Sequence, residues 1–177
     1  MVEKLKLEQL GRVDIETFKQ SDKIPVIVLL DSIRSMNNVG AVFRTADAFI
    51  IEKVVLCGIT PQPPHREIHK AALGATESVE WSYEKEVTDA LQKLKSEGYK
   101  ILAIEQTTGS IALDKQVISK KEKYVVVMGN EVDGVSDEAL ALCDGFIEIP
   151  QLGTKHSLNV SVCAGIIMWE FFKNMKP

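Results

Sequence analysis

Residues 24–33 read IPVIVLLDSI, and residues 37–49 read NNVGAVFRTADAF. The first stretch is an unbroken apolar run of strand length, and such runs are typical of strands buried on both faces of a parallel sheet. The second stretch has apolar residues at helical spacing, with Asn37 or Asn38 available as its cap. A buried strand that leads into a helix indicates a domain of the α/β class.

The same alternation continues along the rest of the chain. Further strands are expected at 53–59, 78–84, 99–106, 124–131 and 145–150, and helices at 66–75, 86–98, 137–143 and 157–174. Strands that alternate with helices predict a mainly parallel sheet flanked by helices. The buried face of the last helix is expected to include Leu158, Val162, Ile166, Trp169 and Phe172.

Residues 1–24 are expected to form a short N-terminal helical extension. Leu5, Leu7 and Leu10 would be its apolar anchors, and Gly11 would end the helix. The whole chain has 177 residues, of which 45% are hydrophobic, so it is long enough for one domain with a substantial core.

Composition and terminal sequence limit the class of protein. No apolar stretch reaches the roughly 18 residues of a membrane span, and the N-terminus lacks the apolar segment of a signal peptide, so we expect a cytosolic protein. Without an export signal, the glycosylation pattern at Asn159 is not expected to be used. The three cysteines are widely spaced and show no metal-ligand pattern, so no metal is expected.

Three loops rich in Gly, Asn and Ser follow predicted strands. They read DSIRSMNNVGAVFRTAD (31–47), MGNEVDGVS (128–136) and QLGTKHSLNVS (151–161). Ligands bind outside the carboxyl ends of parallel strands, so three such loops favour a binding site over simple turn chemistry. Gly129 and Gly134 do not have the spacing of a dinucleotide loop, and Val135 stands where a P-loop requires Lys. The acidic residues beside the two glycines suit a neutral or cationic ligand.

The three loops together resemble the SpoU/TrmH-type RNA 2′-O-ribose methyltransferases of the SPOUT superfamily. The matching motifs are NNVGAVFRTADAF (37–49), VVVMGNEVDGVS (125–136) and IEIPQLGTKHSLNVSVCAGI (147–166). The resemblance covers about 25–173. It implies that residues 25–177 form a SPOUT methyltransferase catalytic domain, an α/β-knot with a C-terminal trefoil knot at about 125–173. It also implies S-adenosylmethionine as the cofactor, RNA as the substrate, and a homodimer with the site near its interface.

The resemblance also implies roles for single residues. Asn38, Arg44, Ser157 and Asn159 would be catalytic, at the reacting ribose. The cofactor would be bound by Gly129, Asn130, Glu131, Ile149, Gly153 and Leu158. Ser157 is also the expected N-cap of the last helix.

Arg44 needs an anionic partner if it is partly buried, and Asp47 or Glu131 would serve as well as an RNA phosphate. A guanidinium does not deprotonate in proteins, so we expect Arg44 to act on the target phosphate or developing alkoxide rather than as a base.

The net charge of −4 argues against a protein that binds nucleic acid over its whole surface, but it permits a local basic patch. Arg66, Lys70 and Lys155 are the candidates for RNA binding. The choice of tRNA or rRNA, and whether the catalytic dimer, the N-terminal arm or another protein makes that choice, stay open. A catalytically inactive relative and another α/β nucleotide-binding enzyme are the alternative interpretations.

Overall fold

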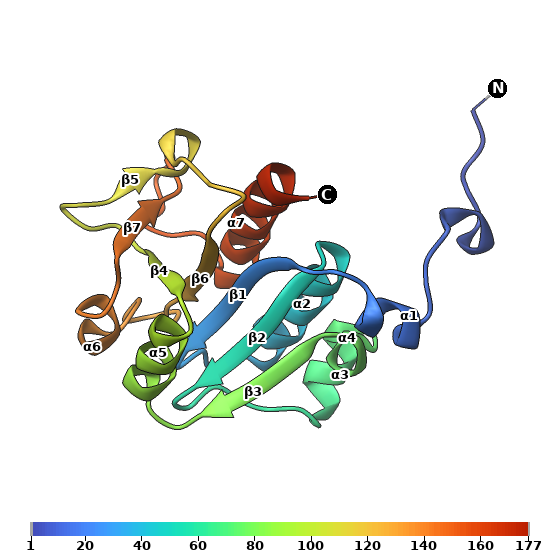
Figure 1. Ribbon diagram of the computed structural model, residues 1–177, viewed down its shortest axis with the longest axis horizontal. Helices are drawn as coiled ribbons and strands as arrows, with labels where there is room; N and C mark the ends of the chain where they lie inside the picture. The colour runs from blue at the N-terminus through green and yellow to red at the C-terminus, as the bar shows by residue number, and fades with distance from the viewer. Residues whose placement is uncertain (1, 177) are drawn as a thin grey trace.

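A computed structural model describes residues 2–176 of the chain. One sheet of seven strands forms its centre, in the order β3-β2-β1-β6-β4-β7-β5, and all neighbouring strands are parallel (Figure 1). The strands are β1 (Ile24–Asp31), β2 (Ile51–Cys57), β3 (Glu80–Glu84), β4 (Tyr99–Ile104), β5 (Ile111–Ala112), β6 (Lys123–Met128) and β7 (Gly145–Glu148). The predicted parallel sheet is therefore confirmed.

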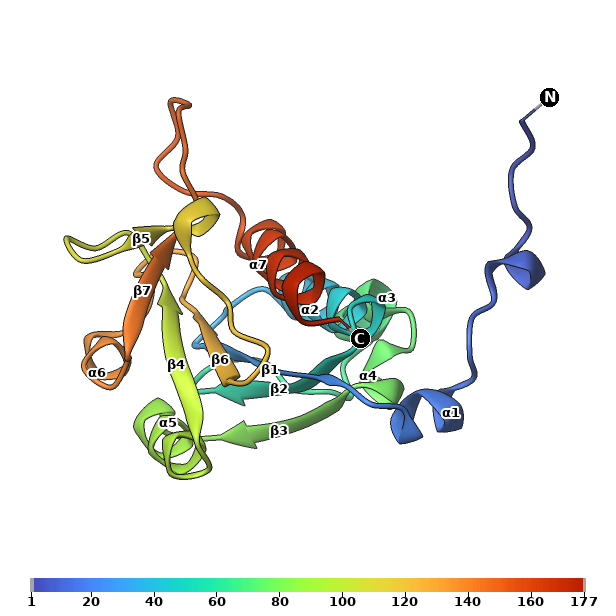
Figure 2. The ribbon, with the colours of Figure 1, turned by 45° about the horizontal axis from the view of Figure 1, so that its top comes forward.

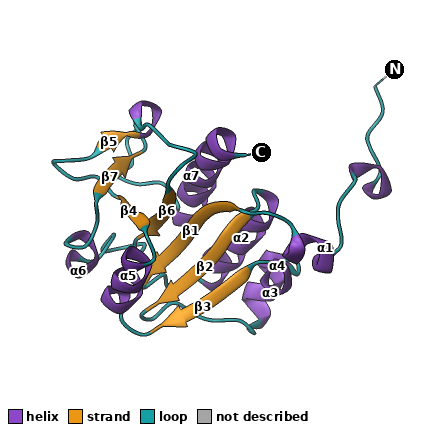
Figure 3. Ribbon diagram, in the orientation of Figure 1, coloured by secondary structure: helices purple, strands orange, loops and turns teal. Residues whose placement is uncertain are grey.

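Helices cover both faces of this sheet (Figure 3). They are α1 (Ile15–Gln20), α2 (Met36–Ala48), α3 (Arg66–Ala72), α4 (Ala75–Ser78), α5 (Val87–Ser96), α6 (Asp137–Leu140) and α7 (Val160–Met175), with short 3-10 helices at Leu7–Leu10 and Leu113–Lys115. Neither α4 nor the strand and 3-10 helix within 107–123 was predicted, because these elements are only two to four residues long.

The apolar run in β1 supplies both halves of the core. Val26 and Val28 pack in the cluster beneath α2, α3 and α7, whereas Ile27 and Leu29 pack in the cluster beneath α5 and α6. Side chains alternate across a strand, so a strand covered on both faces must be apolar at every position. This is the physical reason for the sequence of β1.

The last helix begins later than predicted and buries a different face. Asn159, not Ser157, is its N-cap: the Asn159 side chain accepts a hydrogen bond from the Ser161 backbone amide. Four of the five residues predicted to be buried are exposed, namely Leu158, Val162, Ile166 and Trp169, with Val162 and Trp169 at 52% and 49%. The face that α7 buries is formed by Val160, Ala164, Ile167, Met168, Phe171 and Met175. Because α7 is apolar around most of its circumference, its sequence does not decide which stripe faces the sheet.

The N-terminal extension also differs from the prediction. Leu5 and Leu10 are exposed, so they are not apolar anchors; Phe18 in α1 is buried instead. The segment before α1 is a largely extended arm that runs away from the body (Figures 1 and 2). Gly11 follows the first 3-10 helix in the left-handed conformation, as a residue that ends a helix often does.

Two helix contacts position the segments that follow the strands. Gly40 lets α2 approach α3 closely, since a Cβ at this position would lie 2.5 Å from the Ile68 carbonyl oxygen. After β7 the chain returns across the sheet, and α7 packs on α2 and β1 (Figure 2). The trefoil knot through this crossing stays a prediction of the resemblance. None of the helices within residues 2–176 is long and apolar enough to cross a membrane.

Candidate functional site

A cavity of about 500 Å³ lies at the carboxyl ends of β4, β6 and β7 and extends to the start of α7. Its apolar wall consists of Ile104, Met128, Ile147, Ile149, Leu158 and Val160. Its acidic lining residues are Glu105, Glu131, Asp133 and Glu148, and His156 is the one basic residue among those that line it within residues 2–176. An apolar slot with an acidic rim suits an uncharged aromatic ring that carries a cationic group.

The loop after β6 closes on itself in a tight turn. The Asn130 amide donates to the Gly134 carbonyl at 2.8 Å, and the Gly134 amide donates back to the Asn130 carbonyl at 3.0 Å. Gly134 has a φ of +72°, which favours glycine. A Cβ on Gly129 would lie 2.1 Å from the Gly134 carbonyl carbon, so position 129 has no room for a side chain. Both glycines are therefore required by the turn.

This turn is fastened to the loop after β1. Asp31, only 3% exposed, accepts hydrogen bonds from the Ser136 amide at 3.0 Å and the Ser136 hydroxyl at 2.6 Å. The Asn130 side chain donates to the Ser32 carbonyl at 2.6 Å. Two loops that are about a hundred residues apart in the sequence thus become one rigid rim of the cavity.

Glu131 connects this rim to α2. Its carboxylate accepts from the Arg34 amide at 2.9 Å, the Ser35 amide at 3.1 Å and the Asn38 side-chain Nδ2 at 3.0 Å. Burial raises the pKa of Glu131, but the hydrogen bonds from Arg34, Asn38 and Ser35 outweigh it and hold the pKa of this carboxyl below its ordinary value. Glu131 is therefore ionised at neutral pH and fixes which way the Asn38 amide points.

The hydrogen-bonded chain continues from Asn38 to α7. The Asn159 Nδ2 donates to the Asn38 Oδ1 at 3.2 Å, while the Asn159 Oδ1 accepts from the Ser161 amide at 2.9 Å and the Ser161 hydroxyl at 2.6 Å. Each of the two side-chain amides keeps one N–H group without a partner among residues 2–176. Asn38 and Asn159 therefore present donors at the edge of the cavity.

The family model of the SpoU rRNA methylases matches residues 25–169, which include all three of these loops. This chain belongs to the SpoU rRNA methylase family.

Curated relatives carry names from the same family. A tRNA (guanosine(18)-2′-O)-methyltransferase of Escherichia coli K12 is 34% identical over 81% of this chain, and a TrmH family tRNA/rRNA methyltransferase of Staphylococcus saprophyticus is 28% identical over 88% of it. This chain spans 61% of the length of each of these two relatives.

Solved structures of family members have the same fold. An AdoMet-bound rRNA methyltransferase from Sinorhizobium meliloti superposes on 90% of this chain with a TM-score of 0.80 and 26% identity, and this chain covers 61% of it. A TrmH/SpoU tRNA-modifying enzyme from A. aeolicus gives the same TM-score, identity and coverage of this chain, which spans 80% of that enzyme. The predicted fold class is thereby confirmed, and another kind of α/β nucleotide-binding enzyme finds no support.

The residues predicted from the SpoU motifs fall into two groups. Those that line the cavity are Gly129, Asn130, Glu131, Ile149, Ser157, Leu158 and Asn159. Asn38 joins them through its hydrogen bonds. Gly153 does not line the cavity; it is exposed in the loop after β7, and a Cβ at this position would have no atom within 4 Å. Roles for these residues in binding or catalysis stay predictions.

Arg44 lies away from the cavity at the ends of β4, β6 and β7. It is exposed and lines a separate hollow of about 470 Å³ together with Arg12 and Asp14 of the N-terminal segment. Six residues along α2 amount to about one and two-thirds turns, so Arg44 and Asn38 leave the helix on different sides. Neither suggested partner pairs with it: among residues 2–176 its guanidinium has no carboxylate within ion-pair distance.

Glu105, Gln106 and Cys163 are three of the lining residues that were not predicted from the sequence. Glu105 and Gln106 directly follow β4, whose carboxyl end also lies at the cavity. The predicted strand in this region was the one sign in the sequence that these two residues could lie at the site. Glu105 accepts from the Val135 amide at 3.0 Å, and Gln106 donates to the His156 carbonyl at 3.1 Å. The third is Cys163 of α7. Burial, with the nearby charge of Glu105, raises the pKa of the Cys163 thiol to about 11, so this thiol stays protonated at neutral pH.

Proposed function

We propose that this protein is an RNA methyltransferase that transfers a methyl group from S-adenosylmethionine to a ribose 2′-hydroxyl of tRNA or rRNA. The observation that carries the proposal is the meeting of the three SpoU motifs around one cavity, joined by the hydrogen-bonded chain Glu131–Asn38–Asn159. The names of the relatives supply the reaction and the substrate class.

The lining of the cavity fits this cofactor. Ile149 and Leu158 belong to the apolar wall that would hold the adenine ring, and the turn at Gly129 leaves backbone groups free to approach the ligand. The acidic lining residues, including Glu105 and Glu131, favour a cationic sulfonium. When bound, the cofactor supplies an electrophilic methyl group.

The residues around the cavity would position the RNA ribose for attack. The free N–H groups of Asn38 and Asn159 are donors, so they would hold a ribose oxygen and stabilise negative charge on it rather than remove its proton. Ser157, exposed at the rim, would contact the same sugar. Arg44 would contribute positive charge beside the target phosphate, which lowers the pKa of the 2′-hydroxyl without any proton leaving the guanidinium.

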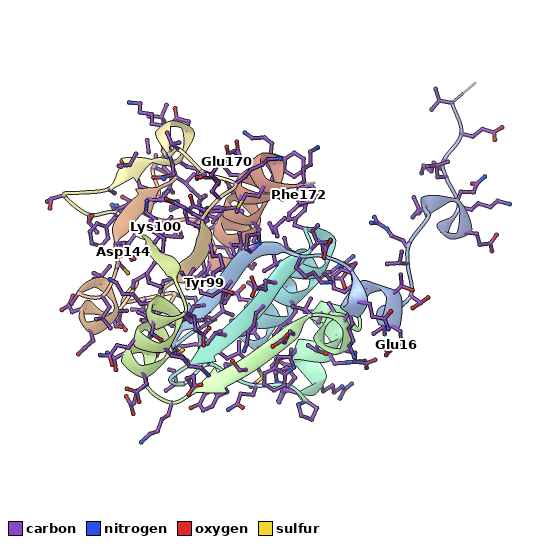
Figure 4. All side chains as sticks on the ribbon, in the orientation of Figure 1. Glu16, Tyr99, Lys100, Asp144, Glu170 and Phe172 are labelled. Carbon is purple, nitrogen blue, oxygen red and sulfur yellow. The ribbon has the colours of Figure 1, made fainter. Side chains whose placement is uncertain are left out.

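We further propose a homodimer in which the exposed face of α7 packs on a second copy of this chain. Val162, Ile166 and Trp169 form an exposed apolar stripe. Phe49 extends the stripe, since its ring centroid lies 5.6 Å from that of Trp169 and 5.4 Å from that of Phe172, which is labelled in Figure 4. Exposed apolar stripes of this kind mark interaction sites.

This dimer would also account for the position of Arg44. Its neighbour Thr45 lies at the crossing of α2 and α7, where the Thr45 methyl group is 3.9 Å from a Cβ built on Gly165. A second copy that packs on α7 would therefore lie close to Arg44. The guanidinium of one protomer would then contact RNA that is bound where the two protomers meet. Arg66, Lys70 and Lys155, all exposed, are the proposed cations for the RNA backbone.

The proposed function is tested in two steps, first by calorimetry with S-adenosylmethionine and then by a methyl-transfer assay. We expect binding at micromolar concentration, followed by transfer of tritium into either tRNA or rRNA at a ribose that becomes resistant to alkaline cleavage. Absence of binding at millimolar cofactor would overturn the proposal. Binding without transfer into either RNA pool would favour the catalytically inactive relative.

A further inference from the structure

A cavity of about 460 Å³ lies at the outer edge of the molecule, between α3, α4 and β3, and the proposed reaction does not use it. Its lining includes the pair Pro63 and Pro64, the side chains of His65, Arg66 and His69, and Trp81 of β3. The volume falls in the range of small-ligand sites, which is roughly 300–1,000 Å³. An aromatic ring, two prolines and three basic side chains thus converge on one hollow.

Trp81 is held rigidly in this hollow. It is half-buried, and its ring meets that of the fully buried Phe43 edge-on, with the centroids 6.5 Å apart and the planes at 88°. Phe43 belongs to α2, so the indole rests on the core of the domain. Its N–H group has no hydrogen-bond partner among residues 2–176. Trp81 therefore offers a fixed aromatic surface and an unused donor.

The basic side chains make the hollow suitable for an anion. The His65 Nδ1 accepts from the Glu67 amide at 3.2 Å, so in the neutral ring the proton lies on Nε2, which remains a donor. Arg66 is exposed and, within residues 2–176, has no carboxylate at ion-pair distance. Glu77 is the one acidic residue among those that line the hollow within the same range. A ligand that combines a flat ring with a negatively charged group matches these side chains, and a nucleotide has both features.

The hollow lies beside α2, the helix that carries Asn38. His65, Arg66 and His69 belong to α3 or its cap, and α3 touches α2 at Gly40, where a Cβ would lie 2.5 Å from the Ile68 carbonyl. Gly40 is only two residues from Asn38, which is hydrogen-bonded to Glu131 at the cofactor cavity. An RNA strand with its ribose at Asn38 would therefore place neighbouring nucleotides beside α3.

We propose that this hollow binds an unpaired nucleotide of the RNA substrate, with the base stacked on Trp81 and a phosphate held by Arg66 and the two histidines. The identity of the ligand as RNA rests on the proposed methyltransferase function. Stacking on an aromatic side chain accepts any base, so this site contributes affinity and selects unpaired RNA rather than a sequence.

Tryptophan fluorescence tests the stacking directly, because the chain has two tryptophans. In Trp169→Phe, Trp81 is the only tryptophan, and a single-stranded RNA hexamer should quench its emission, whereas ribose 5-phosphate should not. In Trp81→Phe, the remaining Trp169 should show no quenching. No quenching of Trp81 by the hexamer, or equal quenching by ribose 5-phosphate, would contradict the proposal.

Charge is tested with a matched pair of variants. Arg66→Gln should weaken hexamer binding about tenfold, a typical effect of losing one phosphate contact of this kind. Lys121→Gln removes the same charge from an exposed site outside the hollow and should leave the affinity unchanged. Equal effects of the two substitutions would show that only net charge matters and would overturn the proposed site.

Methyl-transfer kinetics separate this inference from the proposed function. Trp81→Leu should raise the KM for RNA about tenfold and leave the Kd for S-adenosylmethionine unchanged, while Trp81→Tyr, which keeps a stacking ring, should restore the KM. Quenching of Trp81 without any methyl transfer would uphold the nucleotide site and overturn only the function. Normal transfer with an unchanged KM in Trp81→Leu would uphold the function and overturn the site.

Discussion

Asn37 and Asn38 stand side by side in the sequence but have different surroundings in the fold. Asn38 donates to Glu131 and accepts from Asn159, whereas Asn37 is exposed and its side chain has no hydrogen bond within residues 2–176. The two positions leave α2 about 100° apart. This small rotation decides which amide joins the hydrogen-bonded chain beside the cavity, so the pair provides a natural test of the proposed catalytic geometry.

Replacing Asn38 with Ala should lower the rate of methyl transfer about 100-fold, because it removes a placed donor and releases both Glu131 and Asn159. The Kd for S-adenosylmethionine should change little, since Asn38 contacts the rim rather than the lining. Asn37→Ala is the control and should retain activity. A comparable loss in both variants would rule out the hydrogen-bonded chain as the reason.

Arg44 carries a prediction that depends on the shape of its guanidinium. If it holds a phosphate with two parallel hydrogen bonds, Arg44→Lys should lose most of its activity, and if charge alone matters it should keep a substantial part. Arg44→Gln should lose most of its activity in either case. Because the proposed charge lowers the pKa of the 2′-hydroxyl, the residual activity of Arg44→Gln should show a pH–rate profile displaced to higher pH; a pH–rate profile indifferent to loss of the guanidinium would count against the electrostatic role.

At the scale of elements, the loop after β6 has one well-defined conformation because Gly129 and Asp31 fix its two ends. Gly129 permits the close return of the chain at Gly134, and Asp31 holds Ser136. The loop after β7 is built differently: Gly153 is exposed and touches nothing nearby. One loop is thus a fixed wall of the cavity, and the other owes its position to fewer contacts.

Gly129→Ala should displace the turn, since its new methyl group would overlap the Gly134 backbone. We expect a loss of stability of about 1–3 kcal/mol and at least tenfold weaker binding of S-adenosylmethionine. Gly153→Ala has free space and an ordinary φ, so it should be nearly neutral for stability. Thermal unfolding and calorimetry on the two variants make the comparison; equal tolerance of both would contradict the tight turn.

Asp31→Ala should destabilise the protein by about 1–3 kcal/mol, because the half-buried Ser136 amide and hydroxyl would lose the acceptor that they share. Asp133→Ala, in the same loop, removes an exposed carboxylate and should cost little. Urea unfolding measures both. An effect of Asp31→Ala no larger than that of Asp133→Ala would mean that the link between the two loops does not contribute to stability.

For the whole molecule, α7 is the element with two apolar stripes. One stripe closes the core over β1 and α2, and the other, with Val162, Ile166 and Trp169, is exposed. A helix that is apolar nearly all round is normally buried on both sides. A second copy of the chain is the proposed cover, and the oligomeric state in solution is the measurement that decides it.

Trp169→Asp should convert the dimer to a monomer in light scattering, because it places a charge in the centre of the proposed interface. The rate of methyl transfer should fall together with dimerisation if Arg44 acts on RNA that is bound where the two protomers meet. Val117→Asp places the same charge on an exposed apolar residue far from α7 in the sequence and should leave the dimer intact. A Trp169→Asp variant that remains dimeric would move the interface elsewhere.

The sequence by itself determined the class of fold and the neighbourhood of the site. The apolar run of β1, the alternation of strands and helices, and the three SpoU motifs are local patterns, and a parallel sheet brings the ends of its strands to one edge whatever the details. The loops that carry Gly129, Glu131 and Asn159 could therefore be expected at one edge of the sheet, and the SpoU resemblance assigned these residues to one site.

Only the tertiary structure decided which partners those residues have. Glu131 binds Asn38 and leaves Arg44 without an ion pair among residues 2–176, the start of α7 shifts from Ser157 to Asn159, and α7 turns its Trp169 stripe outward. These outcomes depend on contacts between residues about a hundred positions apart and on which of two apolar stripes the core can accommodate. Periodicity and propensity are properties of neighbours in the chain, so they carry no information about such choices.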